Sequence, residues 1–144
     1  MMAGIRSKDT KPELMIRRAI HALGFRYLLH DRRHPGRPDL VFPRYKAVVF
    51  VHGCFWHGHG CHLFKWPASR KSFWKSKITG NRKRDARSVK GILNAGWRVL
   101  TIWECAIRGR KRRDAATVAK RVAEWLESGD ANTELKGVEH GLDN

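Results

Sequence analysis

Residues 47–51 form an uninterrupted apolar run, Ala-Val-Val-Phe-Val, which constrains the fold more than any other part of the chain. A strand without polar residues on either face is typical of a sheet that is covered on both sides. Residues 97–103 are predicted to form another buried strand of this kind. We therefore expect a central sheet whose interior includes residues 47–51.

Helical patterns alternate with these strands. The first helix begins near residue 11, where Thr10 can cap it. Its apolar stripe consists of Ile16, Ala19, Ile20 and Leu23. The other predicted elements are strands at 25–29 and 39–42, a helix at 81–95 that ends at Gly96, and a last helix capped by Asp114. The alternation indicates an α/β domain with a sheet covered on both faces.

The composition turns polar near the end of the chain. We expect a single domain of residues 1–128, followed by a disordered tail at residues 129–144, because the tail lacks the apolar periodicity of the preceding helix. A chain of 144 residues is long enough for one domain with one core. Any activity must therefore come from one compact unit.

The 144 residues include 30 lysines and arginines against 13 acidic residues, which gives a formal net charge of +17. This balance makes a polyanion the expected partner, with nucleic acid ahead of an anionic membrane surface. No apolar stretch approaches the roughly 20 residues that a membrane-spanning helix requires. The first residues also lack the apolar core of a signal peptide. We therefore expect a cytoplasmic protein without a membrane partner.

The positive charge is densest in the segment 65–90. This segment holds ten lysines and arginines and one acidic residue, Asp85, interleaved with Trp66, Phe73 and Trp74. A solvated helix face is the simpler explanation, but such faces normally mix charges of both signs. We therefore interpret the segment as a surface for phosphates and stacked bases. Its candidate DNA contacts are Lys65, Arg70, Asn81 and Arg84.

A segment rich in histidine and cysteine, residues 52–62, directly follows the predicted central strand. Cys54, His59 and Cys61 can converge on one tetrahedral zinc ion, and Cys105, just after the strand at 97–103, can complete the site. Three cysteines fit reduced thiols that serve a metal better than a disulfide framework. Buried structural cysteines or a catalytic cysteine would explain single residues but not their grouping. We therefore predict a structural zinc site.

Two histidines of this segment, His52 and His57, are not needed for zinc and are free for acid–base chemistry. Asp39 begins a predicted strand beside that of His52, and its carboxylate could hold Mg²⁺. A strand-end aspartate is more often a turn residue, but beside a basic surface these groups favour phosphodiester hydrolysis. Phe55 and Trp56 lie between the polar residues, and the sequence leaves open whether they pack into the core or insert between bases.

Three motifs resemble those of the very-short-patch-repair (Vsr) DNA mismatch endonucleases. They are Pro35-Gly36-Arg37-Pro38-Asp39, the run from Phe50 to Cys61, and Trp103-Glu104-Cys105. The resemblance, which extends from about Ile5 to about Leu126, implies a single-domain restriction-endonuclease-like fold with a mixed central sheet flanked by helices. It also implies a Mg²⁺-dependent endonuclease that nicks one strand 5′ to the thymine of a T:G mismatch left by deamination of 5-methylcytosine. Such a nick initiates very short patch repair.

The resemblance also implies roles for individual residues. Asp39 is similar to the Mg²⁺-binding carboxylate, with the backbone carbonyl of Val51 beside it. His57 is similar to the residue that activates water, and His52 to one that supports the phosphate or the leaving group. Asp85 is similar to the carboxylate that orients the catalytic histidine, and Glu13 to an acidic residue near the metal's waters.

The structural zinc would be bound by Cys54, His59, Cys61 and Cys105. Phe55, Trp56 and Trp74 are similar to aromatic residues that wedge into DNA beside the mismatch. The implied partner is duplex DNA with a T:G mismatch. A monomer would bind it at the nucleoid in the bacterial cytoplasm, ahead of mismatch-repair proteins and a DNA polymerase.

The chain departs from the family pattern at two places. Val51 stands where the best-known member has a threonine, a change that a backbone-carbonyl ligand tolerates. Only Met1 to Lys8 precede the first helix, where family members often carry a longer basic arm, so we expect either a weaker grip on DNA or an incomplete start. Two other functions fit the sequence: a zinc-stabilised DNA-binding protein without catalysis, and a restriction-type endonuclease that cuts matched DNA.

Overall fold

The core of the protein is a five-stranded mixed sheet in the order β1-β2-β3-β4-β5, seen in a computed structural model that describes residues 10–138. The strands are β1 (Leu28–Leu29), β2 (Leu40–Phe42), β3 (Ala47–His52), β4 (Arg98–Trp103) and β5 (Asn132–Leu135). β2 runs antiparallel to both β1 and β3, whereas β3, β4 and β5 are parallel. The predicted α/β fold with a mixed central sheet is confirmed, and β3 is the middle strand.

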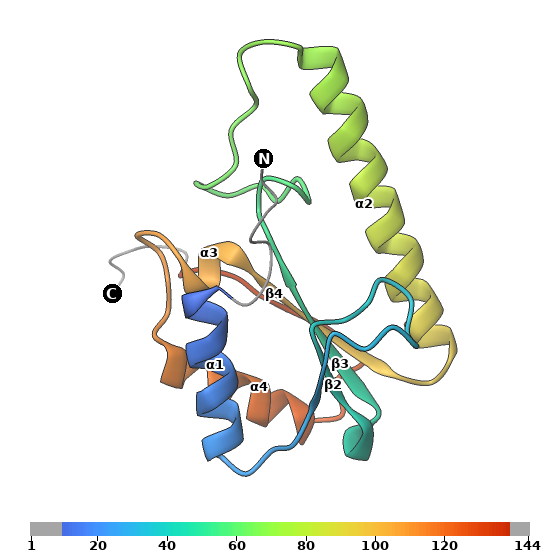
Figure 1. Ribbon diagram of the computed structural model, residues 1–144, viewed down its shortest axis with the longest axis vertical. Coiled ribbons are helices and arrows are strands. Elements are labelled where there is room, and N and C mark those ends of the chain that lie inside the picture. Colours follow the sequence, from blue (N-terminus) through green and yellow to red (C-terminus); the bar gives the residue numbers. More distant parts are fainter. Residues whose placement is uncertain (1–9, 139–144) are drawn as a thin grey trace.

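Helices cover both faces of the sheet (Figure 1). α1 (Lys11–Ala22) and α4 (Ala115–Leu126) pack together on one face, and α2 (Lys71–Asn94) lies on the other. The sheet has a hydrophobic core on each face, and alternate residues of β3 belong to one or the other. Ala47 and Val49 pack toward α1 and α4, whereas Val48 and Phe50 pack toward α2. Residues 47–51 are apolar throughout because both faces of the strand are buried.

Capping residues mark the starts of α1 and α4 where the sequence predicts them. Thr10 Oγ1 accepts a hydrogen bond from Glu13 N at 3.4 Å, and Asp114 Oδ1 accepts one from Thr117 N at 2.7 Å. Each bond satisfies an amide that has no partner inside the helix. Both predicted caps are therefore confirmed. A short 3₁₀ turn, η1 (Pro43–Tyr45), joins β2 to β3, and a short helix, α3 (Glu104–Ile107), follows β4.

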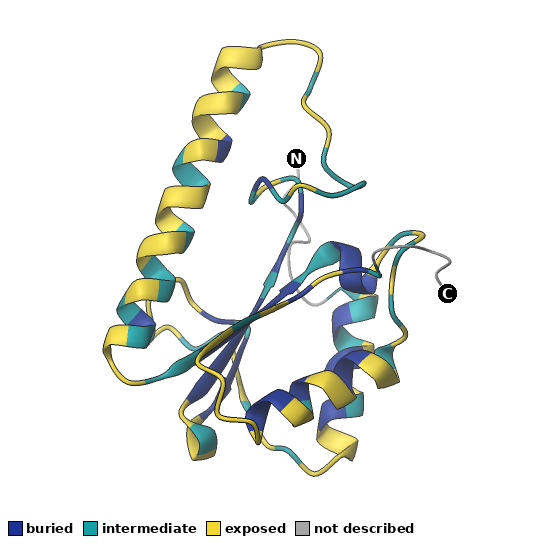
Figure 2. Ribbon diagram, turned by 180° about the vertical axis from the view of Figure 1, so that it is seen from behind, coloured by how far each residue is buried: buried dark blue, intermediate teal, exposed yellow. Residues whose placement is uncertain are grey.

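α2 is longer than the helix predicted at residues 81–95, because it begins at Lys71. Its C-terminal part covers the sheet, but its N-terminal part projects beyond the sheet and is largely exposed (Figure 2). Ile78 is the one buried residue in that projecting part, where it packs over the loop that follows β3. A helical segment with almost no core to face carries no apolar stripe, so periodicity cannot locate its start.

The prediction of a disordered tail from residue 129 is wrong for residues 132–135, which form β5. β5 pairs with β4 in parallel, and only its last residue, Leu135, is buried. Backbone pairing with β4 holds this strand in place, and a polar edge strand leaves little hydrophobic pattern in the sequence. Residues 139–144 of the predicted tail and the short N-terminal arm at residues 1–9 lie outside the described residues.

None of the helices within residues 10–138 combines the length and the hydrophobicity that crossing a bilayer requires.

Candidate active site and metal centre

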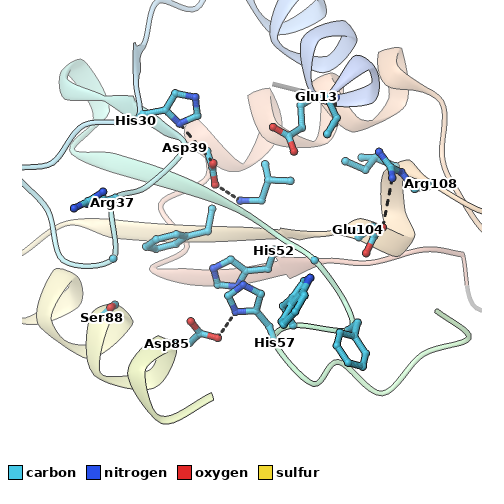
Figure 3. Close-up of a pocket in the computed structure, with 18 of the residues that line it drawn as sticks. Glu13, His30, Arg37, Asp39, His52, His57, Asp85, Ser88, Glu104 and Arg108 are labelled. Carbon is cyan, nitrogen blue, oxygen red and sulfur yellow. Dashed lines mark hydrogen bonds and ion pairs between the residues drawn. The ribbon is translucent and has the colours of Figure 1, made fainter. Parts of the chain in front are cut away.

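A cleft of about 890 Å³ opens at the C-terminal end of β3 (Figure 3). All of the predicted catalytic and magnesium-binding residues line it: Glu13, Asp39, Val51, His52, His57 and Asp85. They come from α1, the start of β2, the end of β3, the loop after β3, and α2. The fold therefore brings together side chains that lie as far apart in sequence as residues 13 and 85.

Asp39 meets the end of β3 because it immediately precedes β2, which runs antiparallel to β3. Its Oδ2 accepts a hydrogen bond from Val51 N at 2.6 Å, and its Oδ1 lies 3.8 Å from His30 Nδ1. Burial raises the pKa of the Asp39 carboxyl, which the Val51 amide and the charge of His30 only partly oppose.

A half-buried carboxylate with too little compensating charge fits a hard divalent cation, because the cation stabilises the ionised form. Asp39 and Val51 both line the cleft and are joined by a hydrogen bond, so they would be the residues to hold a Mg²⁺ ion there. The valine side chain takes no part in such an arrangement.

His52 and His57 stack face to face, with ring centroids 3.8 Å apart and planes within 1°. Burial, followed by the neighbouring His57, lowers the pKa of His52 to about 3, so His52 is neutral near pH 7. His57 Nδ1 lies 2.5 Å from Asp85 Oδ2. This contact places the Nδ1 proton toward the carboxylate and leaves Nε2 of His57 able to accept a proton.

Ligand atoms of His52, His57 and Asp85 also lie within 4.8 Å of one another, which is close enough for a metal. However, the 2.5 Å contact between His57 and Asp85 has the length of a charge-assisted hydrogen bond. The geometry therefore favours an acid–base pair over a second metal site at this position.

The predicted zinc ligands come together. Ligand atoms of Cys54, His59, Cys61 and Cys105 lie within 4.8 Å of one another. His59 Nδ1 is 3.5 Å from Cys54 Sγ and 3.7 Å from Cys105 Sγ. A tetrahedral zinc ion with ordinary bond lengths separates a nitrogen and a sulfur ligand by about 3.6 Å. The donor set and its spacing therefore fit structural zinc.

Backbone amides are directed at all three sulfurs of this site. Cys54 Sγ accepts from Cys105 N at 3.3 Å, Cys61 Sγ from Leu63 N at 3.4 Å, and Cys105 Sγ from Gly137 N at 3.3 Å. Burial raises the pKa of the Cys54 and Cys105 thiols, whereas amide donors favour the thiolate that zinc binds. The site ties the loop after β3 to α3 and to the residues that follow β5.

Phe55, Trp56 and Trp74 form one aromatic cluster. The ring centroid of Phe55 is 5.1 Å from that of Trp56 and 5.4 Å from that of Trp74, and the two tryptophans are 5.8 Å apart. None of the three belongs to either hydrophobic core, and Trp56 is 46% exposed. Core packing therefore does not explain Phe55 and Trp56, which leaves a partly exposed aromatic platform at the edge of the cleft.

Two of the four polar residues predicted as DNA contacts, Asn81 and Arg84, connect to this platform. Asn81 Nδ2 donates to the Trp56 carbonyl at 2.8 Å, and Arg84 donates to Asn81 Oδ1, so both residues also hold the aromatic loop in place. The guanidinium of Arg70 lies 4.3 Å from the centroid of the Phe73 ring. Lys65 is exposed.

Sequence reasoning did not assign a role to six polar residues of the cleft: His30, Arg32, Arg37, Ser88, Glu104 and Arg108. The first three lie in the irregular segment before β2, where no periodicity marks which side chains face the cleft. Glu104 Oε1 accepts a hydrogen bond from Cys54 N at 3.0 Å and so anchors the loop after β3. The motifs around Arg37 and Glu104 were the available signal for those two residues.

Known proteins similar to this chain are named as DNA mismatch endonuclease or as nicking enzymes. The family model described as DNA mismatch endonuclease Vsr matches residues 1–63. The chain is 40% identical over 139 residues to the DNA mismatch endonuclease Vsr of Escherichia coli (strain K12), which covers 95% of this chain and 89% of that protein.

Two further relatives are type II nicking enzymes. V.XorIIP of Xanthomonas oryzae pv. oryzae is 47% identical over 107 residues, 74% of this chain and 79% of that protein. V.NmeAIP of Neisseria meningitidis serogroup A is 43% identical over 110 residues, 76% of this chain and 79% of that protein. With this similarity across nearly its whole length, the chain belongs to the Vsr DNA mismatch endonuclease family.

Proposed function

We propose that this protein is a Mg²⁺-dependent DNA endonuclease that nicks one strand 5′ to the thymine of a T:G mismatch, the first step of very short patch repair. The observation that carries the proposal is the cleft in which Asp39 and the His57–Asp85 pair face one space. An exposed aromatic cluster and a basic helix lie beside that cleft. Relatives named as mismatch endonuclease and as nicking enzymes support cleavage of one strand.

The His57–Asp85 pair is suited to activating the attacking water. Asp85 accepts the Nδ1 proton, so Nε2 of His57 can take a proton from a water that attacks phosphorus. The carboxylate stabilises the imidazolium that forms in this step. The stacked His52 limits the orientations of the His57 ring, since the two rings are parallel at 3.8 Å.

His52 is suited to a different task. With a pKa lowered to about 3, it remains neutral near pH 7 and acts as a neutral hydrogen-bond partner for a phosphate or leaving-group oxygen. A second imidazolium stacked on His57 would be opposed by burial and by like charge. His57 would therefore act as the base, and His52 as the neutral hydrogen-bond partner.

Asp39 and the Val51 carbonyl would hold Mg²⁺, which when bound supplies Lewis-acid polarisation of the phosphate. Glu13, only 8% exposed, lines the same cleft from α1 and is placed to order water there. The amide of Val51 fixes the orientation of the Asp39 carboxylate through the bond at 2.6 Å. These residues position the phosphate for in-line attack.

Recognition of a mismatch would use the aromatic cluster. Inserting Phe55, Trp56 and Trp74 between base steps costs a few kcal/mol of unstacking, and weakly paired bases reduce that cost. α2 presents eight lysines and arginines and a single acidic residue, which suits the flanking phosphates. A single asymmetric nick needs one active site, so a monomer suffices. We propose that it acts in the bacterial cytoplasm at the nucleoid, with mismatch-repair proteins and a DNA polymerase acting after it.

The test is strand-specific cleavage of two matched-length duplexes, one with a T:G mismatch and one fully paired, each with Mg²⁺ or EDTA. We expect a magnesium-dependent nick in the thymine strand of the mismatched duplex only. Asp39→Ala should abolish it, whereas Asp130→Ala, which removes an exposed carboxylate between α4 and β5, should not. Salt-sensitive binding without cleavage would support a DNA-binding protein instead. Cleavage of both strands of the paired duplex would support a restriction-type enzyme.

A further inference from the structure

A second basic segment lies outside the surface at residues 65–90. Residues 108–113, between α3 and α4, read Arg-Gly-Arg-Lys-Arg-Arg, so five of six residues are basic. We call this segment the basic loop. Neither the catalytic residues nor the zinc ligands belong to it.

Among the residues that the structure describes, few acidic side chains offset the charge of Arg108, Arg110 and Arg112 in the basic loop. Arg108 Nη1 lies 3.9 Å from Glu104 Oε2. Asp114, which follows the loop, is engaged in capping α4. Within residues 10–138, no acidic side chain lies within ion-pairing distance of Arg110 or Arg112, and both are exposed. Concentrated and unpaired positive charge of this kind favours a polyanionic partner.

Hydrogen bonds and packing hold the basic loop in one shape. Arg113 N donates to the Ala106 carbonyl at 2.8 Å, and the Lys111 carbonyl accepts from Val138 N at 2.9 Å. Arg112 also donates to the Gly109 carbonyl, through its backbone amide at 3.2 Å and its guanidinium at 3.0 Å.

Gly109 has a positive φ of 90° and lies against the loop after β3, where a Cβ added to Gly109 would be 3.0 Å from His62 Nε2. A loop fixed in this way loses little conformational entropy when its side chains bind.

The basic loop lies across the cleft from α2. Arg108, the first residue of the basic loop, lines the cleft on one side, whereas Asp85 and Ser88 line it from α2. Figure 3 shows Arg108 and Ser88 at opposite sides of the histidine pair. Two cationic elements therefore flank the site at which a phosphodiester would be cut.

We propose that the basic loop binds the phosphate backbone of the same duplex that α2 contacts, on the far side of the cleft from α2. The proposal rests on the proposed function only in taking duplex DNA as the partner. Arg110 and Arg112 contact phosphates and contribute to affinity without sequence preference. Neither residue lines the cleft, so neither takes part in the chemistry.

The test compares the salt dependence of binding for the parent protein and the double variant Arg110→Gln/Arg112→Gln. Losing two phosphate contacts should reduce the steepness of the plot of log association constant against log salt concentration by about 1.8. That slope change corresponds to affinity about 60-fold weaker at 0.1 M salt, with the difference vanishing near 1 M. The matched control Arg44→Gln/Lys46→Gln removes the same charge from exposed positions at the other end of β3, and should leave the slope unchanged. Thermal melting confirms that each variant is folded.

Two further measurements place the contact on the same duplex. At saturating enzyme, the double variant should nick a T:G duplex at the parental rate. Shortening the duplex on one side of the mismatch should abolish the affinity difference between variant and parent, whereas shortening the other side should preserve it. A parental salt slope in the variant, an equal loss in the control, a slower nick at saturation, or a difference that survives both truncations would each overturn the proposal. A parent that binds with the expected slope but does not nick would refute the proposed function alone.

Discussion

Replacing Cys105 by serine tests the metal centre. Cys105 is only 3% exposed, and its sulfur lies 3.7 Å from His59 Nδ1. Structural zinc contributes about 10–16 kcal/mol in small domains at pH 7, so one of four ligands accounts for about 3–4 kcal/mol. This loss weakens zinc binding by roughly 100- to 1,000-fold. Because a domain of this size is stabilised by about 5–15 kcal/mol in total, we expect the melting temperature to fall by roughly 10 °C.

The assay combines zinc content after dialysis with thermal unfolding followed by circular dichroism. EDTA should strip Cys105→Ser at concentrations that leave the parent loaded, and stripped parent protein should melt at or below the temperature of the variant. The control His62→Gln changes a histidine next to Cys61 that lies outside the four-ligand group, and it should keep one zinc per chain. A Cys105→Ser protein that holds one zinc with parental affinity and melts with the parent would refute the assignment.

Three further substitutions test the loop after β3 and the histidine pair. Gly58→Ala places a Cβ 2.7 Å from Ile78 at a φ of 62°, so thermal unfolding should show a loss of about 2–4 kcal/mol, and parental stability would contradict the tight packing there. Trp56→Ala should weaken binding to T:G duplexes by about 1–3 kcal/mol in a titration, because a stacking surface is lost; equal affinity would argue against the wedge. His52→Gln removes a base whose pKa falls from 6.5 to about 3 on folding. Below pH 6.5 the unfolded parent therefore binds more protons than the folded parent. As the pH falls from 6.5 toward 3, the free energy of unfolding of the parent should decrease by up to about 1.4 kcal/mol per pH unit relative to that of the variant. A pH-independent difference between the two in denaturant unfolding would contradict burial of a neutral imidazole.

Elements that face the core could be predicted from the sequence. The runs around Val49 and Leu100 are apolar because each strand is buried on both faces, and Thr10 and Asp114 carry local capping signals. The grouping of the three cysteines with His59 could be predicted as well, because three of the four residues lie close together in one loop and Cys105 was the remaining cysteine. In each case the information lies in residues that are near in sequence or that share one periodicity.

Elements held by long-range contacts could not be predicted in the same way. β5 has one buried residue, Leu135, and exists because β4 offers a free edge for backbone pairing. The first turns of α2 project into solvent and have no stripe. Arg32 and Arg108 line the cleft because irregular segments turn them toward it, and such turns leave no periodic signal. The resemblance to a family supplied the roles of Glu13, Asp85 and the Val51 carbonyl, which spacing alone does not reveal.

Mapping the cut at nucleotide resolution on a T:G duplex, with the paired duplex as reference, tests the central claim most directly. We predict one break in the thymine strand, immediately 5′ to the mismatched thymine, that requires Mg²⁺ and disappears in Asp39→Ala. No break in either strand across several flanking sequences, from a protein that is folded, loaded with zinc and bound to the duplex, would contradict it.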